Sequence, residues 1–262
     1  EKFKPKRMFV QPAANDAGTA LGAALEAHAL TMPGSPAWTM TTATLGPDFT
    51  DDEIAAALDT AGASYRRPKD LCRETAKMLA DGKIIGWFQG RLEFGPRALG
   101  SRSLLADPRR ADIKDRVNKL KSRHAWRPFG PSILAGHEPQ WFEDAFDSRF
   151  MLFTVPVRAD KKTLIPAVLH DDGTTRPQSV HVSEHPLYHR LIAEFEKLTG
   201  VPMLLNTSFN RKDEPIVCTP SEAVEAFLSM GADALAIGPF LASGLKPAKK
   251  AVMDAESAGS LP

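Results

Sequence analysis

Apolar residues along the chain follow two patterns, a helical period and short continuous runs. Five segments after residue 50 repeat apolar residues every three to four positions and carry end signals typical of helices. They are residues 51–62, 71–82, 109–121, 185–200 and 219–231. Thr50 and Thr219 each precede a glutamate by three residues, the spacing of a capping box. We therefore predict these five helices, and a sixth, rich in small residues, from about Gly18.

The continuous apolar runs have the length of strands. They cover residues 84–89, 150–157, 163–170, 176–182, 202–209 and 234–242. Residues 90–103 contain three Gly, one Pro and three Arg, which predicts a long loop after the first of these strands. Because strands and helices mix without strict alternation, the pattern favours an α/β (α+β) fold: a twisted mixed β-sheet with helices packed on it.

The pattern also suggests boundaries. Residues 31–50 are rich in Pro, Gly, Ser and Thr without any period, the composition of a linker. We therefore divide the chain into an N-terminal segment (1–30), a linker (31–50), a main domain (51–245) and a tail (246–262) that we expect to be flexible. The chain begins at Glu1 without a methionine, so we expect a processed chain or the C-terminal part of a longer protein.

Composition narrows the class of protein. A hydrophobic content of 43% and a charged content of 25% are ordinary for a folded globular chain. No stretch approaches the roughly 20 apolar residues that span a bilayer, so we expect no membrane partner. The two cysteines, Cys72 and Cys218, are too few for a disulfide scaffold and indicate a reducing compartment. We therefore expect a cytoplasmic location.

Charge is distributed unevenly, although the formal net charge is only +1. Residues 91–127 contain eight arginines and three lysines against four carboxylates, a local charge of +7 within a remainder of −6. Arginine forks beside glycines suit phosphate, because guanidinium groups bind phosphate oxygens in pairs. Basic residues of the predicted helix, such as Arg109 and Arg116, can instead be solvated surface charges. Four others lie in irregular segments, where loops carry function: Arg97, Arg102, Arg123 and Arg127.

Two polar clusters follow predicted strands. Residues 206–210 (NTSFN) come directly after a buried run, at a place where short amide and hydroxyl side chains can bind a ligand. Residues 170–176 (HDDGTTR) contain two carboxylates that could help hold Mg²⁺. Each cluster can equally be an ordinary turn. The sequence contains no P-loop, no GxGxxG after a strand, no GxSxG and no HExxH.

Four motifs in the same order resemble one family. They are GWFQGRLEFGPRALGSRSLLADP (86–108), NKLKSRHAWRPFGPSIL (118–134), HDDGTTRPQSV (170–180) and LLNTSFNRKDEPIV (204–217). Together they resemble the C-terminal domain of the NodU/CmcH-type O-carbamoyltransferases, over roughly residues 45–245. That domain is similar to YrdC-like domains, in which a twisted mixed sheet surrounds a basic cavity. The resemblance therefore implies the same fold here.

The resemblance also implies an activity. The family's C-terminal domain takes ATP and carbamoyl phosphate and forms carbamoyladenylate, with Mg²⁺ expected beside ATP. A Lys-x-Arg and Ser-x-Asn tetrad would grip the phosphates and the carbamoyl group. The matching residues here are Lys121, Arg123, Ser208 and Asn210. Further ligand-binding residues implied for ATP or carbamoyl phosphate are Arg97, Arg102, Arg127, His170, Arg176 and Asn206. One departure is His124, which stands where the family usually has an acid.

A second domain is implied as a partner. In the family, an N-terminal domain of the actin-like fold moves the carbamoyl group to a hydroxyl-bearing small molecule. The first 30 residues resemble the end of that domain, where the stretch PAANDAGTALGAAL (12–25) supplies an aspartate, here Asp16, that joins two histidines at a metal site. The complete enzyme would hold Fe²⁺ or another divalent metal there. Local chemistry alone would make Asn15 and Asp16 a helix cap.

Two other classes of function stay open at this point. A YrdC-like module could bind nucleotide or RNA in its basic cavity without chemistry, and such RNA binding would weaken steeply with salt. Only Phe94 and Trp126 interleave the basic segment, which argues against a stacking platform for nucleic acid. Alternatively, the domain could serve only as a scaffold for its partner domain.

Overall fold

A computed structural model describes residues 10–36 and 40–245 of the chain. Within those ranges, one sheet of eight strands forms the centre of the molecule, in the order β1-β10-β9-β2-β3-β8-β4-β7. Its strands are β1 (Ala63–Arg66), β2 (Ile85–Phe88), β3 (Arg102–Ala106), β4 (Gly130–Leu134), β7 (Gln178–Val180), β8 (Met203–Ser208), β9 (Ala234–Ile237) and β10 (Phe240–Leu245). The pairs β2/β9 and β4/β7 are parallel and the others antiparallel. This mixed sheet confirms the predicted fold class.

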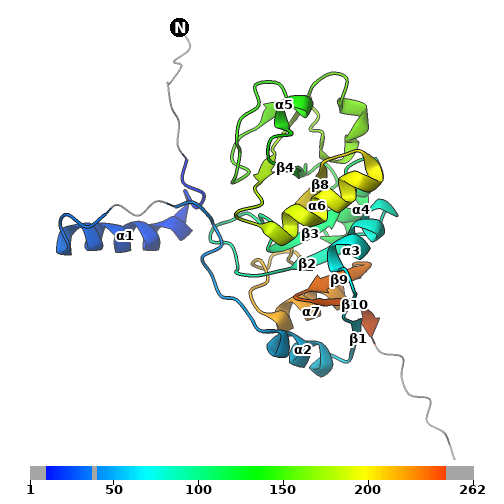
Figure 1. Ribbon diagram of the computed structural model, residues 1–262, viewed down its shortest axis with the longest axis horizontal. Coiled ribbons are helices and arrows are strands. Elements are labelled where there is room, and N and C mark those ends of the chain that lie inside the picture. Colours follow the sequence, from blue (N-terminus) through cyan, green and yellow to red (C-terminus); the bar gives the residue numbers. More distant parts are fainter. Residues whose placement is uncertain (1–9, 37–39, 246–262) are drawn as a thin grey trace, which may run out of the picture.

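Helices cover both faces of the sheet (Figure 1). The α-helices of the described residues are α1 (Asp16–Thr31), which stands apart from the sheet, and α2 (Asp51–Thr60), α3 (Leu71–Ala80), α4 (Ile113–Leu120), α5 (Glu138–Trp141), α6 (Pro186–Thr199) and α7 (Pro220–Met230). Buried side chains of α3, α4 and α6 form one core with the sheet, while those of α2 and α7 form a second core on the opposite face. Successive side chains of a strand point to opposite faces of the sheet, so Leu105 joins the first core and Leu104 joins the second.

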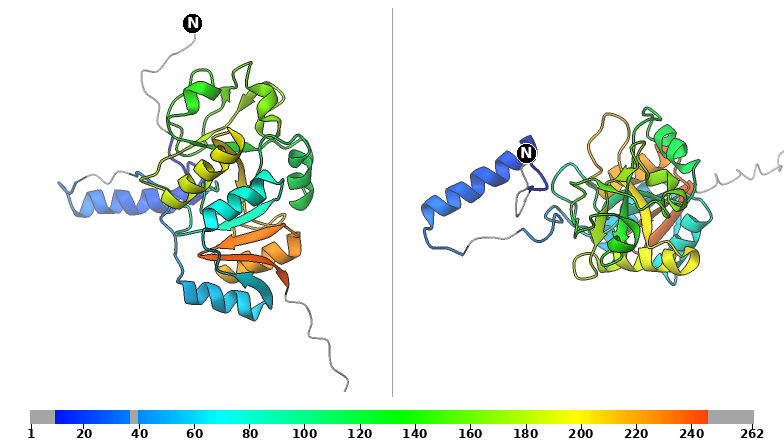
Figure 2. Two further views of the ribbon diagram at one scale, coloured as in Figure 1. Left: turned by 45° about the vertical axis from the view of Figure 1, so that its right-hand side comes forward. Right: turned by 90° about the horizontal axis from the view of Figure 1, so that it is seen from above.

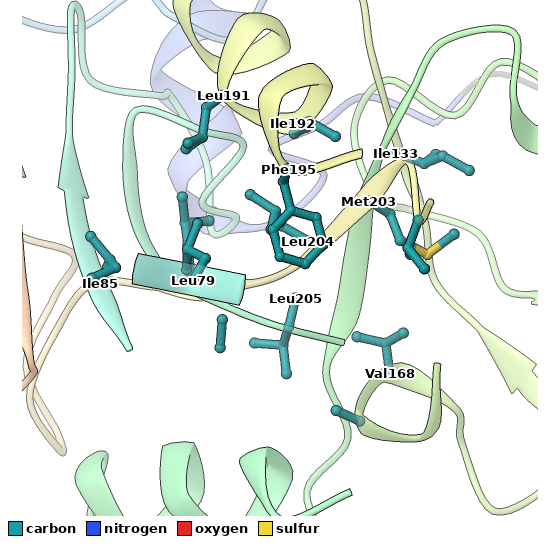
Figure 3. Packing of buried hydrophobic residues seen from close by; sticks show 14 of the residues in the cluster. Leu79, Ile85, Ile133, Val168, Leu191, Ile192, Phe195, Met203, Leu204 and Leu205 are labelled. Atoms are coloured by element: carbon teal, nitrogen blue, oxygen red, sulfur yellow. The ribbon is translucent and has the colours of Figure 1, made fainter. Parts of the chain in front are cut away.

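The first core is the larger. Figure 3 shows how Leu191, Ile192 and Phe195 of α6 pack over the apolar residues of β8. The last three apolar residues of that run, Met203 to Leu205, are 0% exposed, so β8 is held firmly up to the point where its polar residues begin. This packing fixes the strand whose end carries the predicted polar cluster.

Cap residues define the helices as the sequence predicts. Thr50 and Thr219 each close a complete capping box, and the Asp70 carboxylate accepts a hydrogen bond from the backbone N–H of Arg73. Helix α6 ends at Gly200, which adopts the left-handed conformation (φ 73°). The five helices predicted after residue 50 are therefore confirmed, with α4 beginning four residues later than expected.

Several predicted strands differ in the structure. The prediction for residues 163–170 is wrong, because this stretch forms two 3₁₀ helices, η1 (Lys162–Leu164) and η2 (Pro166–Val168). Residues 150–157 contribute only β5 (Val155–Pro156), which pairs with β6 (Thr174–Thr175) in a separate small sheet. The single strand predicted over residues 234–242 is a hairpin of β9 and β10 that turns at Gly238 (φ 50°). The predicted loop 90–103 ends earlier, where β3 begins.

Helix α1 lies apart from this body, although Ala13, just before it, is 1% exposed and lies beside Gly95 of the main domain. Helix α1 has no buried residue, and Figure 2 shows it standing to one side, joined by an extended segment. Outside the gap at 37–39, residues 32–50 form no helix or strand, but part of this stretch packs on the main domain, where Ala43 is 2% exposed in a cluster with Leu99 and Met151. The predicted tail, 246–262, lies outside the described residues. Among the described residues, no helix is long and apolar enough to cross a membrane.

Candidate functional site

The Lys121 side chain joins α4 to the end of β8. Helix α4 stops at Leu120, Lys121 is its C-cap, and Ser122 has a positive φ of 50°, which turns the chain away from the helix axis. Lys121 Nζ lies 2.6 Å from the carbonyl oxygen of Ser208 and 2.8 Å from Oδ1 of Asn210. Ser208 is the last residue of β8. The structure thus brings together two motifs that lie almost 90 residues apart.

The serine and asparagine form one rigid unit with this lysine. Ser208 Oγ donates a 2.6 Å hydrogen bond to Asn210 Oδ1. The Asn210 amide nitrogen donates to the backbone carbonyls of Arg211 and Glu214, so its oxygen must face Lys121. The polar groups of the pair are therefore already oriented before any ligand binds.

Burial makes the charge of Lys121 labile. The residue is only 6% exposed, and no carboxylate accepts a hydrogen bond from its amine among the described residues. Desolvation, followed by repulsion from Arg123 and Arg127, lowers the pKa of Lys121 to about 7. A bound anion would stabilise the charged amine and so offset both effects, which is the behaviour expected of a phosphate-binding lysine.

Four arginines surround an adjoining cavity of about 390 Å³. They are Arg97, Arg123, Arg127 and Arg176, and no carboxylate of the described chain is among the residues lining the cavity. Ser208 also lines it, so the cavity begins where Lys121 is held. These arginines come from the loop before β3, the loop after α4 and the segment before β7. Gly130 at the start of β4 makes this convergence possible, because a Cβ there would lie 2.3 Å from the carbonyl oxygen of Arg176.

The guanidinium groups have unused donors. Nε of Arg97, Nη2 of Arg123 and Nε of Arg176 are buried without a hydrogen-bond partner within the described part of the chain. Burial, followed by the nearby Arg97, lowers the pKa of Arg176, and burial followed by Arg127 lowers that of Arg123 to about 10. Buried donors of like charge are costly unless an anion pairs with them. The cavity is therefore suited to an anion with several oxygens.

A second hollow of about 670 Å³ continues outward from this cavity. It shares Arg123, Arg127 and Ser208 with the cavity and adds Lys121, Asn210 and further polar residues. Because the two hollows share three residues, they form one basic trough. A larger hollow of about 780 Å³ between α4 and α7 is different, because its arginines are already paired: Arg116 with Asp233 and Arg211 with Glu214.

Arg102 lies elsewhere, contrary to its predicted role. It is 0% exposed, it lines neither hollow of the trough, and its guanidinium lies 3.6 Å from the centre of the Phe88 ring. Nη1 donates to the backbone carbonyls of Gln89 and Gly90. Desolvation lowers the pKa of Arg102 to about 10. As the first residue of β3, Arg102 extends into the core, and its hydrogen bonds fix the start of the loop between β2 and β3.

The remaining predicted ligand-binding residues divide in two. Asn206 lines the cavity and is 2% exposed, with its amide nitrogen bonded to the backbone oxygen of Ala98 and to Ser132 Oγ. His170 is half-buried at the edge of the small sheet, where its Nδ1 lies 3.2 Å from Thr174 Oγ1, and it does not line the cavity. Burial lowers the pKa of His170.

The predicted metal ligands do not gather. Asp171 is 94% exposed and Asp172 caps the turn at Thr174, so residues 170–176 form the ordinary turn rather than a Mg²⁺ site. Asp16 is exposed at the start of α1. Within the described residues, no three His, Cys, Asp or Glu side chains are grouped as metal ligands. Residues 170–176 therefore do not fit a resident divalent metal. The metal site assigned to Asp16 stays a prediction, because its two histidines would belong to the N-terminal domain.

Sequence reasoning missed two residues of the site. Trp126 lines the cavity at 70% exposure, and its ring is stacked on that of His124. Glu93, only 5% exposed, accepts hydrogen bonds from the backbone of the loop that carries Arg97. A signal for Glu93 existed in the sequence, since it is one of only four carboxylates in the +7 segment.

The sequence is similar to known carbamoyltransferases and nodulation proteins. It is 46% identical over 242 residues to the nodulation protein NolNO of Sinorhizobium fredii, a match covering 89% of this chain and 35% of that protein. It is 36% identical over 234 residues to a 3'-hydroxymethylcephem-O-carbamoyltransferase of Amycolatopsis lactamdurans, covering 88% of this chain and 43% of that protein. The chain thus spans about a third to somewhat under half of the length of these relatives.

Solved structures add partial likenesses. Full-length HypF in its phosphate- and nucleotide-bound form matches with a TM-score of 0.48 and 19% identity, over 66% of this chain and 22% of that one. Sua5 of P. abyssi complexed with L-threonine matches with a TM-score of 0.48 and 14% identity, over 64% and 46%.

A family model decides the assignment. The model described as "Carbamoyltransferase C-terminus" matches residues 76–243, which is more than half of the chain and includes the basic trough. The resemblance carried by the four sequence motifs is therefore confirmed, and the chain belongs to the carbamoyltransferase C-terminal family.

Proposed function

We propose that this chain forms carbamoyladenylate from ATP and carbamoyl phosphate, for the carbamoylation of a hydroxyl-bearing small molecule. The observation that carries the proposal is the pre-oriented lysine, serine and asparagine at the mouth of a cavity with four arginines and no carboxylate. Both substrates are polyanions. A ligand of this kind would satisfy the unused guanidinium donors and the desolvated amine together.

The chemistry needs fixed positive charge at one place. Carbamoyl phosphate and water give carbamate and inorganic phosphate, and a carbamate oxygen then attacks the α-phosphorus of ATP. The bond from that phosphorus to the bridging oxygen breaks, and pyrophosphate leaves with the electron pair. Repulsion between the carbamate and the phosphate oxygens opposes the attack, so cations placed beforehand lower the barrier. Lys121 and Arg123 would stabilise the developing charge in this trough.

The two hollows suggest how the substrates share the trough. The inner cavity, with Arg97 and Arg176, has the smaller volume and suits carbamoyl phosphate. The outer hollow, with Lys121 and Asn210, suits the polyphosphate of ATP. Mg²⁺ would enter as the ATP complex, held chiefly by phosphate oxygens, because Asp213 is the one carboxylate among the described residues that line the two hollows. Transfer to the acceptor hydroxyl would require a separate transfer domain, in the same chain or as a partner.

ATP–pyrophosphate exchange in the presence of carbamoyl phosphate tests the proposal. The native chain should exchange label only when carbamoyl phosphate is present. Lys121→Met and Ser208→Ala should reduce the exchange rate by about 100-fold, the cost typical of losing one group that stabilises transition-state charge. The matched control is Lys119→Met, which removes an exposed lysine two residues away on α4 and should leave the rate unchanged.

Three outcomes would contradict the proposal. Equal rates in the native chain and in both site variants would remove the site assignment. ATP binding without any exchange would favour a nucleotide-binding module, and RNA binding that weakens steeply with salt would favour an RNA-binding one.

A further inference from the structure

Glu93 is a buried carboxylate without a partner cation in hydrogen-bond contact. It lies in the loop between β2 and β3, which also carries Arg97 into the cavity. Its Oε1 accepts hydrogen bonds from the backbone N–H groups of Leu99 at 2.8 Å and Ser101 at 2.6 Å. Its other oxygen is buried without a partner among the described residues. Glu93 therefore fixes the position of the backbone and does not form an ion pair with a neighbouring cation of the described chain.

The carbonyl groups of the same segment are held from the other side. Gln178 of β7 donates from Nε2 to the Leu99 oxygen at 2.7 Å, and Asn206 of β8 donates to the Ala98 oxygen at 3.0 Å. The amide orientations are fixed, because Gln178 Oε1 in turn accepts from Ser132 Oγ at 2.7 Å. Two strands of the sheet thus grip the loop directly next to Arg97.

The rest of the segment is equally constrained. The Gly100 oxygen accepts from Trp87 Nε1 at 2.9 Å, and its N–H donates to Ser103 Oγ. Gly100 has φ +106°, and a Cβ there would lie 2.2 Å from the Tyr188 ring, so no other residue fits. Every backbone N–H and C=O group of residues 99–101 is therefore bonded. Such complete satisfaction leaves the segment one conformation.

We propose that Glu93 is a positioning residue that holds the segment 98–101 in the conformation that aims Arg97 into the anion cavity. It acts on the ligand only through Arg97, since it does not line the cavity itself. The inference rests on the proposed function for its substrates, but the role can be measured by binding alone. A guanidinium on an unrestrained loop would lose entropy on binding, and this loop has lost that freedom in advance.

The direction in which one substitution changes the phosphate affinity distinguishes a positioning role from a simple effect of charge. Burial raises the pKa of Glu93, and the hydrogen bonds from the backbone of Leu99 and Ser101 oppose that rise by favouring the ionised form. Glu93→Gln keeps the shape and removes the charge of that ionised form. If Glu93 acted only as a nearby carboxylate, this change would strengthen anion binding. If Glu93 positions the loop, replacing charge-assisted bonds by weaker neutral ones should weaken the affinity for inorganic phosphate by about tenfold. Inorganic phosphate, titrated calorimetrically into the full chain, is the probe.

A double-mutant cycle tests whether the effect runs through Arg97. Arg97→Ala should weaken phosphate binding, and adding Glu93→Gln to it should cause no further loss. The matched control is Glu138→Gln, since Glu138 is also 5% exposed and also accepts a backbone N–H, from Gly136 at 2.7 Å, but lies outside the trough. That variant should keep the native phosphate affinity.

Each other outcome overturns the inference. Phosphate affinity that is unchanged or stronger in Glu93→Gln, losses that add up in the double variant, or an equal loss in Glu138→Gln would each do so. If Glu93→Gln fails to fold, Gln178→Met replaces it in the same cycle with the same expected coupling to Arg97. A native chain that binds phosphate but shows no ATP–pyrophosphate exchange would contradict the proposed function. The double-mutant cycle would then still test the positioning role of Glu93. A native chain that binds no phosphate overturns the inference.

Discussion

Lys121 combines burial with hydrogen bonds to neutral oxygens alone, so its protonation should be linked to ligand binding. Its pKa of about 7 means that half of the ligand-free molecules carry a neutral amine at that pH. Bound polyphosphate favours the charged amine, so binding above pH 7 must take up a proton. We therefore expect the affinity for ATP to fall as pH rises from 7 to 9, by up to about tenfold per unit.

The matched variant for this prediction is Lys121→Arg, which stays charged over the whole range. Its affinity for ATP, measured by calorimetry at pH 6.5, 7.5 and 8.5, should change little with pH. A native chain with an equally flat profile would contradict the pKa assigned to Lys121, and an equal slope in both proteins would place the titrating group elsewhere.

At the level of single residues, the sequence motifs predicted most residues of the trough but assigned Arg102 to it wrongly. Lys121, Ser208 and Asn210 were predicted together from a family resemblance, and the structure brings them into contact. Arg102 belongs to the same basic motif, but it is the first residue of β3 and extends into the core against Phe88. The number of arginines in a motif does not say which way each side chain extends. The pairing of the strands determines on which side of the sheet a guanidinium group lies.

Among the elements, helices could be predicted because their signals are local. Caps and apolar periods lie within one segment, and the structure reproduces both capping boxes. Strand β4 was not predicted, because it begins with Gly130 and Pro131, which are residues typical of turns. Residues 163–170 are apolar enough for a strand, but Pro166 begins a 3₁₀ helix instead. Sheet membership depends on distant partners, and no local pattern encodes them.

The cap of α7 gives a prediction at this scale. Thr219 Oγ1 accepts from the backbone N–H of Glu222, whose carboxylate accepts from the N–H groups of Cys218 and Thr219. Thr219→Ala should lower the free energy of unfolding by about 1 kcal/mol, while Thr219→Ser should restore most of it. Urea denaturation measures both, and ATP affinity should stay unchanged because α7 lies outside the trough. An equal loss in the serine variant would show that the methyl group, not the cap, is responsible.

For the whole molecule, the net charge of +1 conceals the feature that matters. The basic segment 91–127 folds so that Lys121, Arg97, Arg123 and Arg127 meet at one trough, while other cations of that segment pair with carboxylates, as Arg109 does with Asp107. The sequence could show the excess charge but not which members of it remain unpaired. That distinction arises only when the sheet brings β8, β4 and β7 side by side.

We expect two histidines to make the stability of the whole molecule sensitive to mild acid. Burial lowers the pKa of His185, and burial followed by repulsion from His137 and His181 lowers that of His189. The unfolded chain therefore takes up protons at higher pH than the native one. By linkage, the free energy of unfolding should be greatest above pH 6.5 and should decrease as pH falls below that value. Hydrogen bonds from Thr174 lower the pKa of Asp172, so its contribution is lost only below pH 3.8.

Thermal unfolding at pH 7.5, 6.5, 5.5 and 5.0 checks this prediction. The melting temperature of the native chain should fall across that range, and the double variant His185→Gln, His189→Gln should show a smaller fall, because neither glutamine can take up a proton. His28→Gln is the matched control, since His28 lies on the exposed helix α1 and its replacement should leave the slope unaltered. The same slope in the double variant would transfer the acid sensitivity to other groups. A smaller slope would instead locate it at α6. The buried residues of α6 join the larger core, so protonation there would destabilise the helix that packs over β8.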